Sequence, residues 1–449
     1  MSKPIIVISC PIDTYSGYGA RSRDFVQALI EIDKYDVKIL PQKWGNTRWG
    51  YLNDHKDTLF TPRLLNGLNT KPDIWVQISI PNEFQKVGTY NIGVTAGMET
   101  TLCHPTWIQG INRMDLALVS TEHSLETFKR SAFTAKDEKT GQETDIRLKT
   151  KVEVLFEGAD LTKYFPSKSP EKSAPELAAL KNKLDSIPEK FCFLTTGHWM
   201  QGAFGEDRKN IGFTIKSFLE TFKNKKNQPA LIMKCHSVTT SIMDRDRMMN
   251  MIYKVRKTVK GSLPNIYLIH GEVSDSEINL MYNHPKVKCF VSHTKGEGFG
   301  RPFLEFSLTN KPIIASSWSG QTDFLDQEFV RYVKGDLTKV HESAVVKDMI
   351  LAESQWFTPD AADVAKAYKD IYKNYDKWLV KAKRQGHRSR TTFSYEKMVE
   401  SLKAIVDNNI PEIAKQVPIT LPKLNLPKLK KLSGKGEPQK ITLPKLNRI

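Results

Sequence analysis

An apolar run, a set of alternating glycines and a proline follow one another in the second half of the chain. Residues 287–291 are expected to form a buried strand, because a largely apolar run is typical of a strand covered on both faces of a parallel sheet. Glycines at alternate positions from Gly296 to Gly300 allow a tight turn, and Pro302 suits the first turn of a helix. This strand, turn and helix predict an α/β fold built on parallel strands.

Two carboxylates lie on either side of this turn. Glu297 falls in the turn, and Glu305 falls about one helical turn into the following helix, so that both side chains can face one ligand. Carboxylates accept hydrogen bonds from sugar hydroxyls, and the free amides at a helix N-terminus favour the negative charge of a diphosphate. The segment therefore predicts a sugar-nucleotide site. A plain strand, turn and helix with incidental surface acids is the alternative.

The rest of the chain alternates strands and helices in two sets. With 449 residues, 39% of them hydrophobic and 10% aromatic, it is long enough to form two cores. A polar, proline-containing stretch ending near residue 190 is expected to be the linker, and residues 134–150 an exposed loop. Helical periodicity at 361–384 and 395–408 would close the fold. Two doubly wound parallel sheets are expected, with strands at 4–9, 37–40, 74–78, 92–95, 116–120 and 152–156, then at 191–195, 230–234, 266–269, 287–291 and 313–315.

The order Gly-Glu-Gly-Phe-Gly-Arg-Pro-Phe-Leu-Glu at residues 296–305 resembles the Gly-Glu-Gly-Phe-Gly-x-Pro-x-x-Glu element of the retaining glycosyltransferases of family 4. That resemblance implies a GT-B fold, which is α/β with two Rossmann-like parallel-sheet domains facing across a cleft. It implies an acceptor-side domain at 1–170, a nucleotide-sugar-binding domain at 190–385 and a helix at 386–410 that returns to the first domain. A basic, proline-containing tail at 411–449 lies outside the resemblance.

On this resemblance, Glu297 holds the sugar and Glu305 the ribose of a nucleoside-diphosphate sugar, with a UDP-sugar as the expected donor. Arg208 and Lys209 lie in a loop before a helix, and their fixed charges can stabilise a leaving diphosphate without a metal. Which of the two binds phosphate is open, because the family separates its two basic residues. A solvated charge pair is the alternative. Lys234, at the end of a strand, is a weaker candidate for phosphate binding than Arg208 or Lys209. Neither a metal site nor a cofactor is expected.

Further donor contacts are implied by the resemblance at glycine turns and strand ends. The turn of Gly17 and Gly19 opens a helix, as in dinucleotide sites, but Arg21 and Ser22 stand where a third glycine is needed, which argues against NAD. The donor-binding positions are Gly17, Gly19, Gly197, Gly298, Phe299, Gly300, Ser319 and Gly320.

The acceptor side is expected in the first domain, along residues 93–101. Many family members have a histidine after this strand that contacts the donor sugar. This chain has Gly97-Met98-Glu99 there, with His104 further on. Glu99 is the candidate that orients an acceptor hydroxyl, and a buried structural glutamate is the alternative.

The net charge of +17 points to a polyanionic partner. Residues 411–449 hold nine Lys or Arg against two Glu, so the tail contributes +7 and the rest of the chain +10. Nucleic acid, an anionic membrane face and an acidic glycan all suit such a charge, as does a lysine-rich soluble surface with no such partner. Five scattered cysteines fit a reducing compartment, and a short apolar start with no 18-residue apolar run predicts a cytoplasmic protein without a transmembrane segment.

Residues 17–23, 96–101 and the tail look like those of glycosyltransferases encoded by large tailed bacteriophages, which would place the protein in the host cytoplasm. The expected acceptor is then a hydroxymethylated pyrimidine in double-stranded DNA, a base that must be flipped out of the duplex. Residues 43–51 offer basic and aromatic side chains for stacking, although core packing explains the same aromatics: Trp44, Arg48, Trp49 and Tyr51. The Leu-Pro-Lys-Leu repeats of the tail suit a protein partner.

Other acceptors and other functions remain open at this point. A surface polysaccharide, a lipid-linked glycan or a protein is the alternative acceptor. A non-catalytic nucleic-acid-binding GT-B module, or a nucleotide-sugar epimerase that hydrolyses the donor without an acceptor, is the alternative of another class. The presence of both glutamates with both basic residues favours an active transferase.

Overall fold

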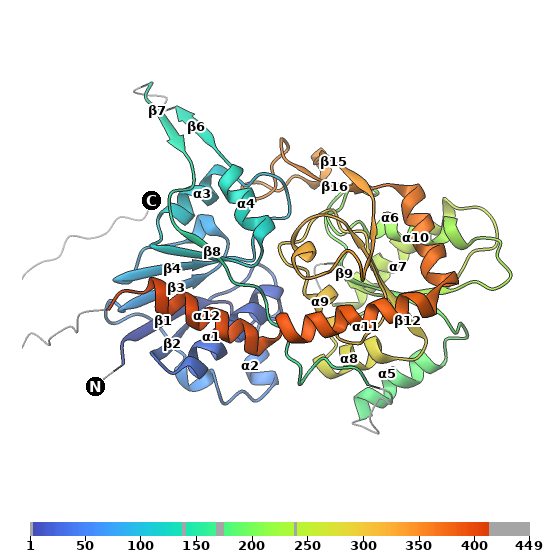
Figure 1. The fold of residues 1–449 in the computed structure, drawn as a ribbon, viewed down its shortest axis with the longest axis horizontal. Coiled ribbons are helices and arrows are strands. Elements are labelled where there is room, and N and C mark those ends of the chain that lie inside the picture. The colour runs from blue at the N-terminus through green and yellow to red at the C-terminus, as the bar shows by residue number, and fades with distance from the viewer. Residues whose placement is uncertain (1–2, 137–140, 168–174, 238–239, 413–449) are drawn as a thin grey trace, which may run out of the picture. The chain divides into compact units, whose positions relative to one another are not determined.

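The computed structural model describes residues 3–136, 141–167, 175–237 and 240–412 (Figure 1). These residues contain two six-stranded sheets, in which every pairing between neighbouring strands is parallel. Helices cover the sheets, and the α/β fold with two parallel sheets is confirmed. The Leu-Pro-Lys-Leu repeats of the tail lie outside the described residues.

The first sheet has the strand order β2-β1-β3-β4-β5-β8. All six of its strands were expected from their apolar runs, because a parallel strand is buried on both faces. Its strands are β1 (Ile5–Cys10), β2 (Asp36–Pro41), β3 (Ile74–Ile78), β4 (Tyr90–Val94), β5 (Leu116–Val119) and β8 (Val152–Val154). The helical segments along it are α1 (Gly17–Ile32), α2 (Tyr51–Asp54), η1 (Thr61–Arg63), η2 (Pro81–Glu83), α3 (Pro105–Asn112) and α4 (Glu122–Arg130).

The second sheet has the order β11-β10-β9-β12-β13-β14. One buried cluster contains Phe290 and Phe303, and another contains Phe193 and Phe218. The strands are β9 (Cys192–His198), β10 (Ala230–His236), β11 (Ile266–Ile269), β12 (Val287–Ser292), β13 (Ile313–Ser316) and β14 (Arg331–Val333). Around them lie α6 (Ile211–Phe222), α7 (Ile242–Lys257), α8 (Asp275–Asn283), α9 (Arg301–Ser307), η3 (Gly320–Asp323), β15 (Gly335–Lys339), η4 (Glu342–Ala344), β16 (Gln355–Pro359) and α10 (Ala361–Lys373).

The last two helices connect the two sheets, as the red ribbon in Figure 1 shows. Helix α11 (Tyr375–Thr392) packs against α9, beside the second sheet. Helix α12 (Tyr395–Asn409) packs against α1, which follows the first strand of the chain. Among the described helices, none has an apolar stretch long enough to cross a lipid bilayer.

Two segments differ from their sequence-based expectation. Residues 134–150 were expected to form a loop, but β6 (Phe133–Lys136) and β7 (Glu143–Ile146) pair as an antiparallel hairpin. The linker stretch contains α5 (Pro175–Asp185), which packs on α8. The hairpin is polar and exposed at most positions, so it lacks the alternation by which sequence reasoning recognises a strand. Helix α5 does have an apolar face, with Leu177, Leu180 and Leu184 at helical spacing against the core, which the polar and proline-containing composition of the stretch obscured.

Candidate active site

The loops at the carboxyl ends of the two sheets touch each other. Thr121, just after β5, donates a hydrogen bond of 2.9 Å from its hydroxyl to the carbonyl oxygen of Gly298, which lies after β12. A side chain at Gly298 would collide with the carbonyl oxygen of Ala96, and one at Gly296 with the carbonyl oxygen of Glu99. These glycines are therefore required by the contact between the two loops as well as by the turn.

Lys209 and Glu297 form the centre of this region. The Lys209 ammonium lies 2.6 Å from Oε1 and 2.7 Å from Oε2 of Glu297, and both side chains are largely buried. Burial alone would raise the pKa of Glu297, but the charges of Lys209 and Arg208 outweigh it and hold that pKa below its usual value. Burial lowers the pKa of Lys209 in spite of the attraction of Glu297. Glu297 is thus an ionised carboxylate, able to accept hydrogen bonds from hydroxyl groups.

Arg208 connects this pair to the first sheet. Its Nη1 lies 3.3 Å from Oε2 of Glu297 and 3.5 Å from Oε1 of Glu99, which follows β4. The same nitrogen donates to the carbonyl oxygen of Gly296 at 3.0 Å. Burial opposes the charged form, but Glu99 and Glu297 together raise the pKa of Arg208. Two cations and two carboxylates therefore balance in charge.

The loop that carries these cations is fixed by its neighbours. The amide of Lys295 donates to the carbonyl oxygen of Arg208 at 2.8 Å. Asp207 accepts from the amide of Ile211 at 3.2 Å, at the start of α6, and burial raises the pKa of Asp207 to about 6. Asn210, between them, has a positive φ of 54°. This sharp turn directs two adjacent basic side chains toward Glu297.

Ser319 and Gly320 hold the backbone of Glu297 from the other side. The Ser319 hydroxyl accepts a hydrogen bond of 2.9 Å from the Glu297 amide, and the Gly320 amide donates to the Glu297 carbonyl oxygen at 3.0 Å. Ser319 has a φ of 77°, a backbone conformation that costs free energy in a residue other than glycine. The loop after β13 is thus strained where it fixes the position of Glu297.

Glu305 lies on α9 in a second charged cluster. Arg301, one turn earlier, approaches Glu305 at 3.5 Å and also contacts Asp24 at 2.6 Å and Glu157 at 3.2 Å. Asp24 comes from α1 and Glu157 follows β8, so this arginine joins the two halves of the fold. Burial raises the pKa of Glu305 to about 7 although the charge of Arg301 opposes the shift. Burial lowers the pKa of Arg301, but the charges of these carboxylates raise it by more.

The remaining positions expected to bind the donor are four glycines and Phe299. Gly197 lies against the stem of Lys209, and Gly300 has a φ of 101° at the N-cap of α9. Gly17 begins α1 and faces open space, whereas Gly19 packs tightly on Thr14. The ring of Phe299 packs in the core with a ring-centroid distance of 4.9 Å to Phe324, so only its backbone is left to face a ligand.

The first-sheet residues expected to serve the acceptor have structural partners of their own. His104 caps α3 by accepting from the Thr106 amide at 3.3 Å. Trp44 stacks on Tyr18 with ring centroids 4.0 Å apart, and the Tyr18 hydroxyl reaches Thr95 at 3.0 Å. Arg48 pairs with Asp54, while Trp49 is exposed. Of these, the Tyr18 and Trp44 pair lies beside the strand end that leads to Glu99.

Sequence reasoning missed several charged or polar groups near the strand ends. Arg301, Asp24 and Glu157 form the cluster around Glu305, and the spacing of four residues between Arg301 and Glu305 was the available signal. His198 and His236 end two paired strands with ring centroids 4.2 Å apart, and burial lowers their pKa values to about 3 and about 4. Lys234, which the sequence did suggest as a weaker candidate, lies on the same strand as His236, and burial lowers its pKa. The described residues hold no group of three or more His, Cys, Asp or Glu arranged to bind a metal ion.

No protein-family model matches the chain, and no curated protein sequence matches it. Solved structures do match. A sucrose-phosphate synthase from Thermosynechococcus elongatus is 12% identical with a TM-score of 0.58, covering 90% of this chain and 98% of that one. A glycosyltransferase from Rickettsia africae is 13% identical with a TM-score of 0.60, covering 92% and 100%. HepE of Anabaena, in complex with UDP-glucose, is 13% identical with a TM-score of 0.56, covering 90% and 100%. Such likeness over nearly whole chains shows that this protein has the GT-B fold.

Proposed function

We propose that the protein is a retaining, metal-independent glycosyltransferase that moves a sugar from a nucleoside-diphosphate sugar, in our reading a UDP-sugar, to an acceptor hydroxyl. The observation that carries the proposal is the buried contact of Lys209 and Arg208 with Glu297, at the place where the two sheets meet. A structure of HepE with UDP-glucose has a similar fold, and the chain contains the Gly-Glu-Gly-Phe-Gly order of family 4.

The charges of this cluster suit the reaction. A donor diphosphate brings negative charge that Lys209 and Arg208 can stabilise as fixed cations, in the role that a metal ion has in other transferases. Glu297 is then available to accept hydrogen bonds from the sugar, and it stays ionised because its pKa is low. Glu305 is assigned to the ribose of the donor.

The chemical step is written as a substitution at the anomeric carbon of the sugar. The acceptor oxygen forms a bond to this carbon on the face from which the diphosphate leaves, while the bond from carbon to phosphate oxygen breaks. The proton of the acceptor hydroxyl passes to the leaving phosphate. Developing positive charge on the sugar is favoured by the Glu297 carboxylate, and Glu99 is positioned by Arg208 on the acceptor side.

The proposed acceptor is a hydroxymethylated pyrimidine in double-stranded DNA of a bacteriophage, which places the protein in the cytoplasm. The net charge of +17 supports this choice, since phosphate backbones attract basic proteins. A surface polysaccharide, a lipid-linked glycan or a protein is the second candidate acceptor. The tail is proposed to bind a protein partner through its Leu-Pro-Lys-Leu repeats.

The test is a transfer assay with the purified full-length protein. It is incubated with a panel of nucleotide sugars and a duplex containing hydroxymethylcytosine, and the digested nucleosides are weighed by mass spectrometry. A nucleoside heavier by one sugar supports the proposal. Release of the nucleoside diphosphate without a modified nucleoside overturns the DNA acceptor. Free sugar formed without any acceptor identifies a hydrolase or epimerase instead. A non-catalytic module would release no diphosphate from any donor.

A further inference from the structure

Helix α11 carries an unusual density of positive charge. Its eighteen residues contain six Lys or Arg and a single acid, Asp376. Arg390 has a structural role, because it donates to the carbonyl oxygen of Leu308 and to Asn310. Of the other five, Lys377, Lys383 and Arg384 are exposed, and Lys381 and Arg388 are half-buried.

These cations are not neutralised by neighbours. On the adjacent α12, Lys397 pairs with Glu400 at 2.6 Å and Lys403 with Asp407 at 3.6 Å. Within the described part of the chain, neither Arg384 nor the other Lys and Arg side chains on the outer side of α11 form an ion pair. The helix therefore presents free positive charge, where α12 presents balanced pairs.

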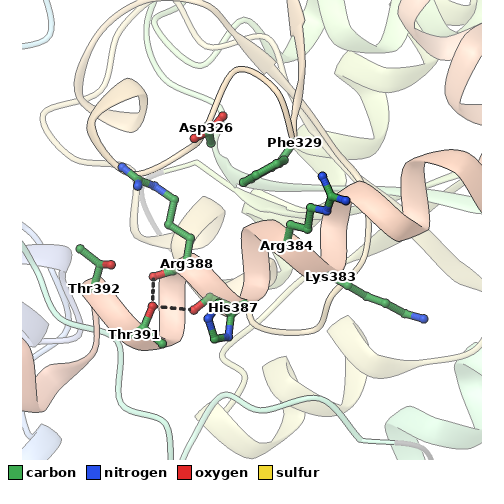
Figure 2. Close-up of a pocket in the computed structure, with 8 residues that line it drawn as sticks. All are labelled: Asp326, Phe329, Lys383, Arg384, His387, Arg388, Thr391 and Thr392. Carbon is green, nitrogen blue, oxygen red and sulfur yellow. Dashed lines mark hydrogen bonds between the residues drawn. The ribbon is translucent and has the colours of Figure 1, made fainter.

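The C-terminal half of α11 also forms one side of a hollow of about 560 Å³ (Figure 2). Figure 2 shows Arg384 and Arg388 extending from the helix toward the loop that carries Asp326 and Phe329, while Lys383 and His387 extend away from that loop. Two guanidinium groups, those of Arg384 and Arg388, therefore line one open hollow, together with Lys383 and His387. Guanidinium groups bind phosphate oxygens through charge-assisted hydrogen bonds, so this lining suits a phosphate group.

The loop opposite the helix is held in place without using these cations. Gln385 of α11 accepts from the Asp326 amide at 2.8 Å and donates to the Phe324 carbonyl oxygen at 2.9 Å. The Asp326 carboxylate, the one acid lining the hollow, accepts from the Glu328 amide at 2.8 Å. The hollow is thus preformed, and its acid already has a partner.

The geometry points to the phosphodiester backbone of duplex DNA as the ligand of this face of α11, an inference that rests on the proposed DNA acceptor and adds where the duplex is held. Residues 377, 381, 384 and 388 follow one another at helical spacing along about 16 Å. One DNA strand advances about 3.4 Å per phosphate along the duplex axis, so this row spans about five phosphates. An anionic membrane would also need apolar groups beside the cations, and of the large hydrophobic side chains of the described helix only Val380 is exposed.

The test is the salt dependence of binding of the full-length protein to a labelled, unmodified duplex. The variant Arg384→Gln/Arg388→Gln is compared with Arg247→Gln/Lys254→Gln on α7, which removes the same charge from a second surface hollow. We expect binding about tenfold weaker in the α11 variant, with the slope of log K against log salt reduced by about two, and little change in the α7 variant. Lys377→Gln/Arg384→Gln, at two exposed positions of the same row, repeats the test if the first variant folds poorly.

The outcomes separate this inference from the proposed function. Equal loss in the α7 variant, or unchanged binding in both α11 variants, overturns the assignment of α11 and leaves the transferase proposal intact. If the α11 variants lose binding to phosphatidylserine vesicles but keep binding to duplex DNA, the assignment of α11 to DNA is overturned in favour of a membrane. No binding of duplex by the unaltered protein overturns both the assignment and the DNA acceptor. Binding that depends on α11 without any sugar transfer supports the assignment and counts against the proposed reaction.

Discussion

The ammonium of Lys209 contacts both carboxylate oxygens of Glu297, at 2.6 Å and 2.7 Å, in a largely buried position between two sheets. Each charge compensates the other where water has little access. Removal of either one leaves its partner as an uncompensated charge in a low-dielectric environment. A diphosphate that binds to Lys209 must therefore compete with Glu297. This competition has a measurable consequence.

Replacing Glu297 by glutamine should strengthen the binding of UDP and abolish most of the transfer. The substitution removes the anion that competes with the diphosphate, so we expect UDP to bind at least about tenfold more tightly by calorimetry. Transfer should fall by about a hundredfold, because the carboxylate that stabilises the sugar is lost. Glu206→Gln is the matched control, since Glu206 lies in the loop that carries Lys209 but pairs with Lys295. Weaker UDP binding in Glu297→Gln would contradict the competition.

The raised pKa of Glu305, about 7, predicts a pH dependence of stability. This carboxyl binds a proton more tightly in the folded protein than in the unfolded chain. Its contribution to the free energy of unfolding is therefore full at low pH and is lost as the pH rises to about 7. Glutamine does not titrate, so the Glu305→Gln variant does not lose stability in this way as the pH rises. The melting temperature of the variant relative to wild type should therefore be higher at pH 8 than at pH 5. A difference that does not change with pH would rule out the shifted pKa.

Removal of Arg301 should destabilise the protein strongly. Leucine at this position leaves Asp24, Glu157 and Glu305 close together without the cation that they share. We expect a loss of about 3 kcal/mol in the free energy of unfolding, measured by urea denaturation at pH 8. Adding Glu157→Gln to the Arg301→Leu variant should recover part of it, because one uncompensated charge is then gone. Additive losses in the double variant would show that the two residues do not interact.

Alanine should destabilise the protein at Gly296 but not at Gly17. At Gly296 the methyl group collides with the Glu99 carbonyl oxygen, so the contact between the loops is disturbed and we expect a loss of about 1–3 kcal/mol in stability. At Gly17 the methyl group meets open space, so stability should be nearly unchanged. If Gly17 faces the donor, KM for the nucleotide sugar rises in Gly17→Ala while the melting temperature stays constant. An unchanged KM would remove Gly17 from the site.

The sequence supported the sheets and the turn of Glu297 well, and the long-range contacts poorly. Apolar strands such as β9 and β12 are visible because burial on both faces leaves a continuous hydrophobic run. The adjacency of Arg208 and Lys209 left open which one meets phosphate, and the structure places both on Glu297. The cluster of Arg301 with Asp24 joins residues 277 positions apart, which no local pattern can reveal.

The polar elements were missed for a related reason. Hairpin β6/β7 has exposed side chains at most positions, so it lacks the alternation that identifies a strand. Residues 361–384 were expected to be helical from their periodicity, and this stretch holds α10 and the first part of α11, which continues to Thr392. The free positive charge of α11 emerged only when the neighbouring side chains were placed. Charge in a sequence shows what is present, whereas its neutralisation depends on the fold.

The most direct test of the central claim is calorimetric titration of wild type and Lys209→Gln with UDP-glucose and a panel of other nucleotide sugars. We predict that wild type binds at least one of them, and that Lys209→Gln binds the same donor at least about tenfold more weakly, because a fixed cation facing the diphosphate is lost. Equal affinity in the two proteins, or no binding of any donor by wild type, would contradict the assignment of the Lys209 and Glu297 cluster as a nucleotide-sugar site.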